Sequence, residues 1–272
     1  MYPDLFDLSI GDYVLSITSY RFFGALGAIF FLFYYLKILQ QYGLSITAKI
    51  ISAVMISLSF LIGSRLLYSI LSFERILDDP ELLYTLKLIN FSLFGGLTLS
   101  LFTWWVVSKR YQLPFLKLTD KFVLPAALTL IFFRTGCFLN GCCFGKTTDL
   151  PWGVTFPRGS MSHMVQITPN PFSFFVSPRP VHPTQLYEIL GLFIAMLIAW
   201  LIWKRNKIPG LMATLFVVLY TAVRVINQFL RYYPDSVQSP QTLLAPIMYI
   251  LIIVTFSVLI YFLYRKQYQL RV

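Results

Sequence analysis

Charged residues are scarce in this chain. Of its 272 residues, 12% are Asp, Glu, Lys or Arg and 57% are hydrophobic. A soluble domain carries about 25% charged residues, so the composition argues against an ordinary soluble protein. It fits a bundle of membrane helices, each of which needs about 20 apolar residues to cross a bilayer. We therefore predict an all-α integral membrane protein.

Acidic residues are the scarcer of the two charge types. The sequence has 11 of them against 22 basic residues, which gives a formal net charge of +11. Such an excess can indicate a nucleic-acid-binding protein. Here, however, the basic residues stand in short clusters between apolar runs, the pattern of cytoplasmic loops in membrane proteins. Nucleic acid is therefore not a predicted partner.

Histidine and cysteine are rare as well, with two and three residues. Because Cys137, Cys142 and Cys143 fall so close together, they cannot form the disulfide framework of a small secreted fold. Their spacing is not Cys-x2-Cys, and His163 and His182 lie well downstream, so no zinc site is predicted. No cofactor is predicted either. Three interpretations of the cysteines stay open: packing at a helix end, one disulfide, or a reactive thiol that carries an acyl or alkyl group.

The apolar residues fall into seven runs that are long enough to span a bilayer. The segment before them, residues 1–12, is acidic and lacks the basic start of a signal peptide, so no cleavage is predicted. The whole chain, 1–272, is predicted to be one transmembrane domain of about seven helices. Their predicted bounds are Phe22–Leu39, Ile50–Ile70, Phe91–Val107, Phe122–Leu139, Gln185–Trp203, Leu211–Phe229 and Leu243–Leu263.

The polar segments between these runs alternate in charge. Basic clusters follow the third, fifth and seventh runs, whereas acidic residues precede the first and follow the second. By the positive-inside rule, the N-terminus lies outside and the C-terminus in the cytoplasm. The segment 141–183, rich in proline and aromatic residues, is then a small extracytoplasmic head, since so long a loop in a compact bundle is usually functional. The segment 71–90 is predicted to be an interfacial arm.

Three arginines, Arg65, Arg134 and Arg224, lie inside apolar runs. Each costs several kcal/mol there unless it is paired, solvated or able to reach the interface. Counted at 1.5 Å per residue from the inner edge, all three reach a depth of roughly 20–24 Å, in the outer half of the bilayer. Each could snorkel outward or pair with a local carboxylate. Alternatively, they bind a lipid phosphate, which guanidinium groups recognise through paired hydrogen bonds.

Other polar residues and glycines reach the same predicted depth, and together they indicate one polar cavity that opens outward. These residues are Gly95, Gly96, Asn140, His182, Glu188, Asn227 and Gln228.

Two sequence motifs carry a more specific signal. One begins at Arg134-Thr-Gly136-Cys137 and continues through Asn140-Gly141 to Pro151-Trp152-Gly153 and Phe156-Pro157. The other is His182-Pro-Thr-Gln-Leu-Tyr-Glu188. Later segments are Pro209-Gly210, Tyr220-Thr-Ala-Val-Arg224 and Arg231-Tyr-Tyr-Pro234-Asp235. In this order and spacing, over nearly the whole chain, they resemble the prolipoprotein diacylglyceryl transferase family.

The resemblance implies a seven-helix protein of the bacterial inner membrane with an external head. It implies transfer of diacylglyceryl from phosphatidylglycerol, or another anionic phospholipid, to a cysteine thiol of a prolipoprotein or related acceptor. The residues that it implies for catalysis are Arg134, Arg224, His182, Glu188 and Tyr220. Those implied for substrate binding are Arg65, Gly95, Gly96, Gly136, Asn140, Gly141, Gln185, Tyr187 and Arg231.

The chain departs from the family pattern at several positions. The His-Gly-Gly of the family reads Phe94-Gly95-Gly96 here, so one functional histidine is replaced by an apolar ring. The other departures are Phe23, Cys137, Cys142, Val181 and Gln228. The chain thus keeps the arginines but has lost several acid–base and hydrogen-bonding groups.

Alkyl transfer to a thiol needs a stabilised leaving phosphate, a thiolate and aligned reactants. His182 and Glu188 are the remaining candidates for a base, although His182 could only cap a helix and Glu188 could only pair with an arginine. The first hypothesis is a phospholipid-dependent transferase. The alternatives are a non-catalytic paralogue that binds phospholipid or lipoprotein, and, with less support because no inverted repeat is found, a small-solute transporter.

Overall fold

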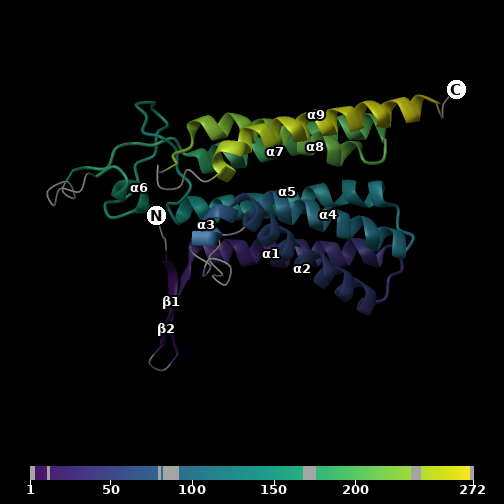
Figure 1. The fold of residues 1–272 in the computed structure, drawn as a ribbon, viewed down its shortest axis with the longest axis horizontal. Helices are drawn as coiled ribbons and strands as arrows, with labels where there is room; N and C mark the ends of the chain where they lie inside the picture. Colours follow the sequence, from purple (N-terminus) through teal and green to yellow (C-terminus); the bar gives the residue numbers. More distant parts are fainter. Residues whose placement is uncertain are drawn as a thin grey trace.

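Seven long helices dominate the computed structural model, which describes residues 4–10, 13–78, 81, 92–167, 176–233 and 240–269. Their bounds are α1 Ser19–Gln40, α2 Ile46–Leu71, α4 Leu93–Arg110, α5 Phe115–Leu139, α7 Thr184–Asn206, α8 Leu211–Leu230 and α9 Pro240–Gln269. The helices lie side by side along one direction (Figure 1). All except α4 are long and apolar enough to cross a membrane. The prediction of a helical, multi-pass membrane protein is confirmed.

Helix α4 packs closely against α2. Gly95 on α4 faces Gly63 on α2 so closely that a Cβ on either would collide with the carbonyl oxygen of the other. Farther along, the Thr103 hydroxyl donates a 2.7 Å hydrogen bond to Ser59 Oγ. Small and hydroxyl residues are typical of helix–helix contacts inside membranes. Helix α4 therefore pairs with α2 through small and hydroxyl-bearing residues.

A β-hairpin precedes the first helix and was not predicted. Strand β1, Asp4–Ile10, pairs in antiparallel register with β2, Tyr13–Thr18. Figure 1 shows this hairpin at the same end of the bundle as the head loop and α6, Met161–Met164. The strand sequences alternate polar and apolar residues over short runs, which is the period of a strand. Helices were predicted from long apolar runs, and these strands are too short to form one.

Helix α5 lies between two groups of helices. It contacts α1 on one side and α7 and α8 on the other, while α9 packs on α8. Near its start, the buried Asp120 side chain accepts hydrogen bonds from the backbone N–H groups of Gly210, at 2.7 Å, and Ala213, at 2.9 Å. These N–H groups open α8, so Asp120 acts as an N-cap supplied by another helix, where a carboxylate also meets the positive end of the helix dipole.

Asp120→Ala is expected to lower the free energy of unfolding by about 1–3 kcal/mol, because it leaves two N–H groups without their acceptor. The measurement is the thermal midpoint of the purified protein in detergent. Asp149→Ala, at an exposed position of the head, is the matched control and should leave the midpoint unchanged. An Asp120→Ala midpoint equal to that of the wild type would contradict the assigned capping role.

The head follows α5 and is held by short backbone pairings. Val181 exchanges hydrogen bonds with Val154, at 3.0 and 3.1 Å, and the N–H of Lys146 donates to the carbonyl of Leu230 at the end of α8. His163 is buried in the head, where one ring nitrogen accepts from the N–H of Gly159 and the other lies 2.9 Å from the carbonyl oxygen of Val176. These contacts give His163 a structural role within the head.

The segment 71–90, expected to be an interfacial arm, lies largely outside the described residues. What is described begins with a short helix, α3, Phe73–Asp78, after the end of α2.

Candidate functional site

Two arginines share one buried carboxylate at the head end of the bundle. Arg134 on α5 pairs through Nε with Oε2 of Glu188 on α7, and Arg224 on α8 pairs through Nη1 with Oε1 of the same residue. The Glu188 side chain is 1% exposed, against 13% and 16% for the arginines. The two arginines and one carboxylate carry a net charge of +1. The cluster thus has one positive charge that the protein's own carboxylate does not neutralise.

Tyr249, on α9, completes the arginine cluster. Its buried hydroxyl accepts hydrogen bonds from Nη2 of Arg224, at 3.0 Å, and from Nε, at 3.3 Å. Sequence reasoning missed Tyr249, since α9 reads as an uninterrupted apolar span. The available signal was a hydroxyl group inside that span, which must find a partner when buried.

Phe94 takes part in the same cluster through its aromatic ring. Its centroid lies 5.6 Å from that of Tyr249, which binds Arg224. The position where the family pattern has histidine therefore carries an apolar ring that lies against the tyrosine bound to Arg224.

Tyr220 lies within electrostatic reach of Arg134, Arg224 and Glu188, as the family resemblance implies for a site residue. It is on α8, one turn before Arg224, and its ring stacks on that of Phe216 at 6.0 Å. The structure thus brings four of the five predicted catalytic residues into one cluster.

The fifth, His182, belongs to a neighbouring group. Its Nδ1 lies 3.2 Å from the hydroxyl of Tyr187, which also accepts a 2.9 Å hydrogen bond from the indole N–H of Trp152. Its backbone pairs with Gly145 and Lys146 of the head. His182 and Tyr187 therefore join the start of α7 to the head.

Thr184 and Gln185 hold the turn that follows α5. The Thr184 hydroxyl donates a 2.6 Å hydrogen bond to the carbonyl of Cys143, and the Gln185 amide donates one of the same length to the carbonyl of Cys142. Asn227 on α8 donates to the carbonyl of Thr184 at 3.1 Å. The buried amide oxygens Oε1 of Gln185 and Oδ1 of Asn227 have no hydrogen-bond partner among the described residues.

The glycines of the predicted substrate site are explained by close backbone approach. A Cβ on Gly96 would collide with Ser64 Oγ, and one on Gly136 would lie 2.9 Å from Cβ of Phe23, on α1. Gly141 has φ of +70°, a left-handed conformation that glycine adopts without strain, directly after Asn140 ends α5. Gly95 lies where α4 crosses α2.

Arg65 and Arg231 each have an aromatic ring as a neighbour. The Arg65 guanidinium lies 5.8 Å from the ring centroid of Tyr68 on the same helix. Arg231 follows α8, and its guanidinium lies 5.4 Å from the ring centroid of Tyr233. Three arginines were predicted at one depth. Among the described contacts, Arg134 and Arg224 are joined through Glu188.

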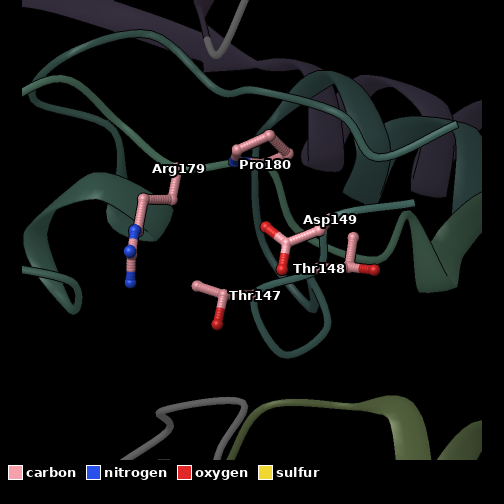
Figure 2. Close-up of a pocket in the computed structure, with 5 residues that line it drawn as sticks. All are labelled: Thr147, Thr148, Asp149, Arg179 and Pro180. Atoms are coloured by element: carbon pink, nitrogen blue, oxygen red, sulfur yellow. The ribbon is translucent and has the colours of Figure 1, made fainter. Parts of the chain in front are cut away.

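Two hollows open on the head. A cavity of about 500 Å³ is lined by Phe144, Gly145, Lys146, Thr147, Val165, Gln166, Arg179, Val181, Tyr232 and Tyr233. A smaller pocket of about 110 Å³ lies beside it (Figure 2). There Thr147 and Asp149 lie across the hollow from Arg179 (Figure 2). Burial raises the pKa of Tyr233, which lines the larger cavity, despite the opposing effect of Arg231.

The three cysteines are free thiols that gather at the end of α5. Their sulfur atoms lie within 4.8 Å of one another, and Cys137 is fully buried. Hydrogen bonds from the thiols of Cys137 and Cys142 lower the pKa of Cys143 against the effect of burial, and Arg231 and Arg134 act in the same direction. The structure thus contains no disulfide among them.

The fold and the site define a multi-pass helical membrane protein with an arginine pair on one buried carboxylate. The chain belongs to the prolipoprotein diacylglyceryl transferase family, whose sequence model matches residues 8–262. The resemblance drawn from the motifs is confirmed.

Individual relatives agree with this assignment. The chain is 36% identical over 172 residues to a phosphatidylglycerol–prolipoprotein diacylglyceryl transferase of Clostridium tetani, with 63% of each protein covered. It is 32% identical over 177 residues to a protein of the same name from Nitratidesulfovibrio vulgaris, with 64% of the chain and 60% of the relative covered. A transferase 2 of that name from Clostridium perfringens is 27% identical over 219 residues, 80% of each. The first two alignments span less than two thirds of the relatives' length.

Proposed function

We propose that this protein transfers diacylglyceryl from phosphatidylglycerol, or another anionic phospholipid, to the thiol of a prolipoprotein cysteine. The observation that carries the proposal is the buried cluster in which Arg134 and Arg224 share Glu188. The names of the relatives support the same reaction.

In the proposed reaction, the thiolate sulfur of the acceptor attacks the diacylglyceryl carbon that is bonded to the phosphate oxygen. A C–S bond forms, the C–O bond breaks with its electron pair going to oxygen, and glycerol phosphate leaves. The proton of the thiol passes to a base or to water. Negative charge on the leaving phosphate increases along this path, and fixed positive groups stabilise it.

The arginine cluster is suited to that task. The two guanidinium groups together carry ten N–H donors, more than one carboxylate and one phenol hydroxyl can accept. The cluster's net positive charge favours an anionic headgroup, and guanidinium matches phosphate in geometry. We assign Arg134 and Arg224 to the phosphate and Glu188 to holding them in position. The open acceptors on Gln185 and Asn227 suit hydroxyl groups of the lipid glycerol.

The contacts do not single out one residue as the base that takes the thiol proton. Glu188 is engaged by two arginines. His182 is hydrogen-bonded to Tyr187 in the adjoining group. A free thiol is already a few per cent thiolate at neutral pH, so transfer proceeds without a dedicated base, but more slowly.

A non-catalytic phospholipid- or lipoprotein-binding role is the second candidate. The observation that favours it is Phe94, which places an apolar ring against Tyr249 where the family pattern has a histidine.

An assay with radiolabelled phosphatidylglycerol and a synthetic lipobox peptide tests the two candidates. We expect label to move to the peptide in a thioether that resists alkaline hydrolysis. Binding of labelled lipid without any transfer would instead support the second candidate. A peptide with Ser in place of the lipobox Cys is the control.

Phe94→His is expected to raise the rate of transfer, because it restores a group that titrates near neutral pH beside Tyr249, which binds Arg224. A well-placed base contributes about 10²–10⁴-fold, and we expect less here because the site is not shaped around an imidazole. The measurement compares turnover at matched expression, with Phe94→Leu as an apolar control. Robust wild-type turnover that Phe94→His abolishes would contradict this interpretation of the position.

We further propose that the protein lies in a bacterial inner membrane with its head and N-terminus outside and its C-terminus in the cytoplasm. The basic clusters after the third, fifth and seventh spans support this orientation. An alkaline phosphatase fusion at Val272 should be inactive, since that enzyme needs export to fold. A fusion of green fluorescent protein at the same residue should fluoresce. The reverse result for the two fusions would reject the orientation.

A further inference from the structure

The three-cysteine cluster at the end of α5 has a geometry that the proposed transfer does not use. The sulfur atoms of Cys137, Cys142 and Cys143 lie within 4.8 Å of one another. These are the only cysteines of the chain, and none is in a disulfide. Three thiols that converge on one point form a potential trigonal ligand set.

The backbone of the cluster is held in place before any ligand binds. Cys143 has φ of +64°, a left-handed conformation that is unfavourable for a non-glycine residue. Hydrogen bonds from Thr184 and Gln185 fix the carbonyls of Cys143 and Cys142, and the N–H of Cys142 donates to the carbonyl of Cys137. The turn thus keeps an unfavourable backbone conformation that brings Cys143 to the other two thiols.

The surroundings favour a negatively charged complex. Arg231 and Arg134 lie within electrostatic reach of Cys143. No histidine is available as a further ligand among the described residues, since His163 is held by Gly159 and Val176 and His182 by Tyr187. A zinc ion, which takes four ligands in structural sites, would lack a protein ligand here. A soft ion that is satisfied by three thiolates fits the ligand set better.

We propose that Cys137, Cys142 and Cys143 form a binding site for one soft monovalent metal ion, copper(I), coordinated by three thiolate sulfurs. Binding changes no oxidation state: three S–H bonds are lost, three Cu–S bonds form and three protons pass to solvent. The complex has a net charge of −2, which the two arginines offset in part.

The bound ion would also connect two elements of the active site. Cys137 belongs to α5, whereas Thr184 and Gln185, which bind the turn, begin α7. Glu188 lies one turn farther along α7. A metal at the cysteines would therefore stiffen the junction that positions Glu188, and by binding only the folded state it would raise the thermal midpoint.

The test is a titration of the reduced, full-length protein in detergent, under anaerobic conditions, with copper(I) supplied from a chromophoric chelator. We expect the protein to withdraw about one copper ion per chain and X-ray absorption at the copper edge to show three sulfur neighbours. Cys137→Ser, Cys142→Ser and Cys143→Ser should each weaken binding about tenfold or more. The triple Ser variant, which keeps all seven methionines, is the control for thioether binding.

A second measurement needs no variant and guards against misfolding of the substituted chains. In the wild type, copper(I) should protect the thiols from alkylation by a maleimide.

Equal copper uptake by the triple Ser variant would overturn the proposal. So would stoichiometric binding of zinc(II) without binding of copper(I), or a disulfide within the cluster in protein isolated from membranes under alkylating conditions. None of these measurements uses diacylglyceryl transfer, so the site and the proposed function are tested separately.

Discussion

Glu188→Gln is expected to lower both the stability and the activity of this protein more than any other single substitution in the site. The change removes the one carboxylate that Arg134 and Arg224 share. Two guanidinium groups would then face each other in a largely buried site without a counter-charge. Breaking a buried ion pair by removing one partner costs about 3–5 kcal/mol. We expect a fall of several degrees or more in the thermal midpoint.

The same substitution should reduce diacylglyceryl transfer by about 10²-fold or more, since a displacement of about 1 Å in a positioned catalytic group has that effect. Both quantities are to be measured on purified protein at matched concentration. Asp149→Asn, in the exposed part of the head, removes a carboxylate without touching the cluster and serves as control. Wild-type stability and turnover in Glu188→Gln would show that the arginines are held by something else.

Arg134→Lys and Arg224→Lys are each expected to reduce lipid-dependent activity by about tenfold or more, equivalent to about 1.4 kcal/mol. Lysine keeps the positive charge but loses the planar, forked set of donors that matches phosphate. At Arg224 it also cannot donate to Tyr249 in the same two-point manner. The measurement is the rate of label transfer from phosphatidylglycerol over a range of lipid concentrations.

Arg158→Lys, at an exposed position of the head, is the matched control and should keep full activity. Unchanged activity in both site variants would remove the arginine pair from the mechanism. A loss of stability alone, with turnover per folded molecule preserved, would assign the pair a structural role.

The sequence allowed the helices to be predicted because a bilayer imposes long apolar runs. It also allowed Arg134, Arg224 and Glu188 to be predicted as one group, because charges inside such runs must find each other or water. All three reach one depth by residue counting. Their contacts across α5, α7 and α8 agree with that expectation.

The contacts between helices could not be predicted, because they depend on which side of each helix faces which neighbour. Tyr249 carries no charge and so gave no signal in an apolar span. Gly95 and Gly96 were predicted in a substrate site, and their place at the close approach of α4 to α2 was not foreseen. Gln185 was expected to touch substrate, and the hydrogen bond from its amide N–H to the carbonyl of Cys142 was not foreseen. Such assignments require the rotation of each helix about its axis, which composition and length do not specify.

The pairing of Lys146 with Leu230 has a consequence for biosynthesis. The ribosome makes Lys146 long before Leu230, and α7 and α8 must both be threaded into the bilayer between the two events. At roughly 5–20 residues per second, the start of the head waits on the order of ten seconds for its partner. In the proposed orientation, the start of the head is translocated during that interval with only its pairing to His182, and so is more open to extracytoplasmic proteases than in the finished chain. Truncation before α8 should therefore yield a nascent chain whose head is cleaved, while α1 to α5 stay protected in the membrane.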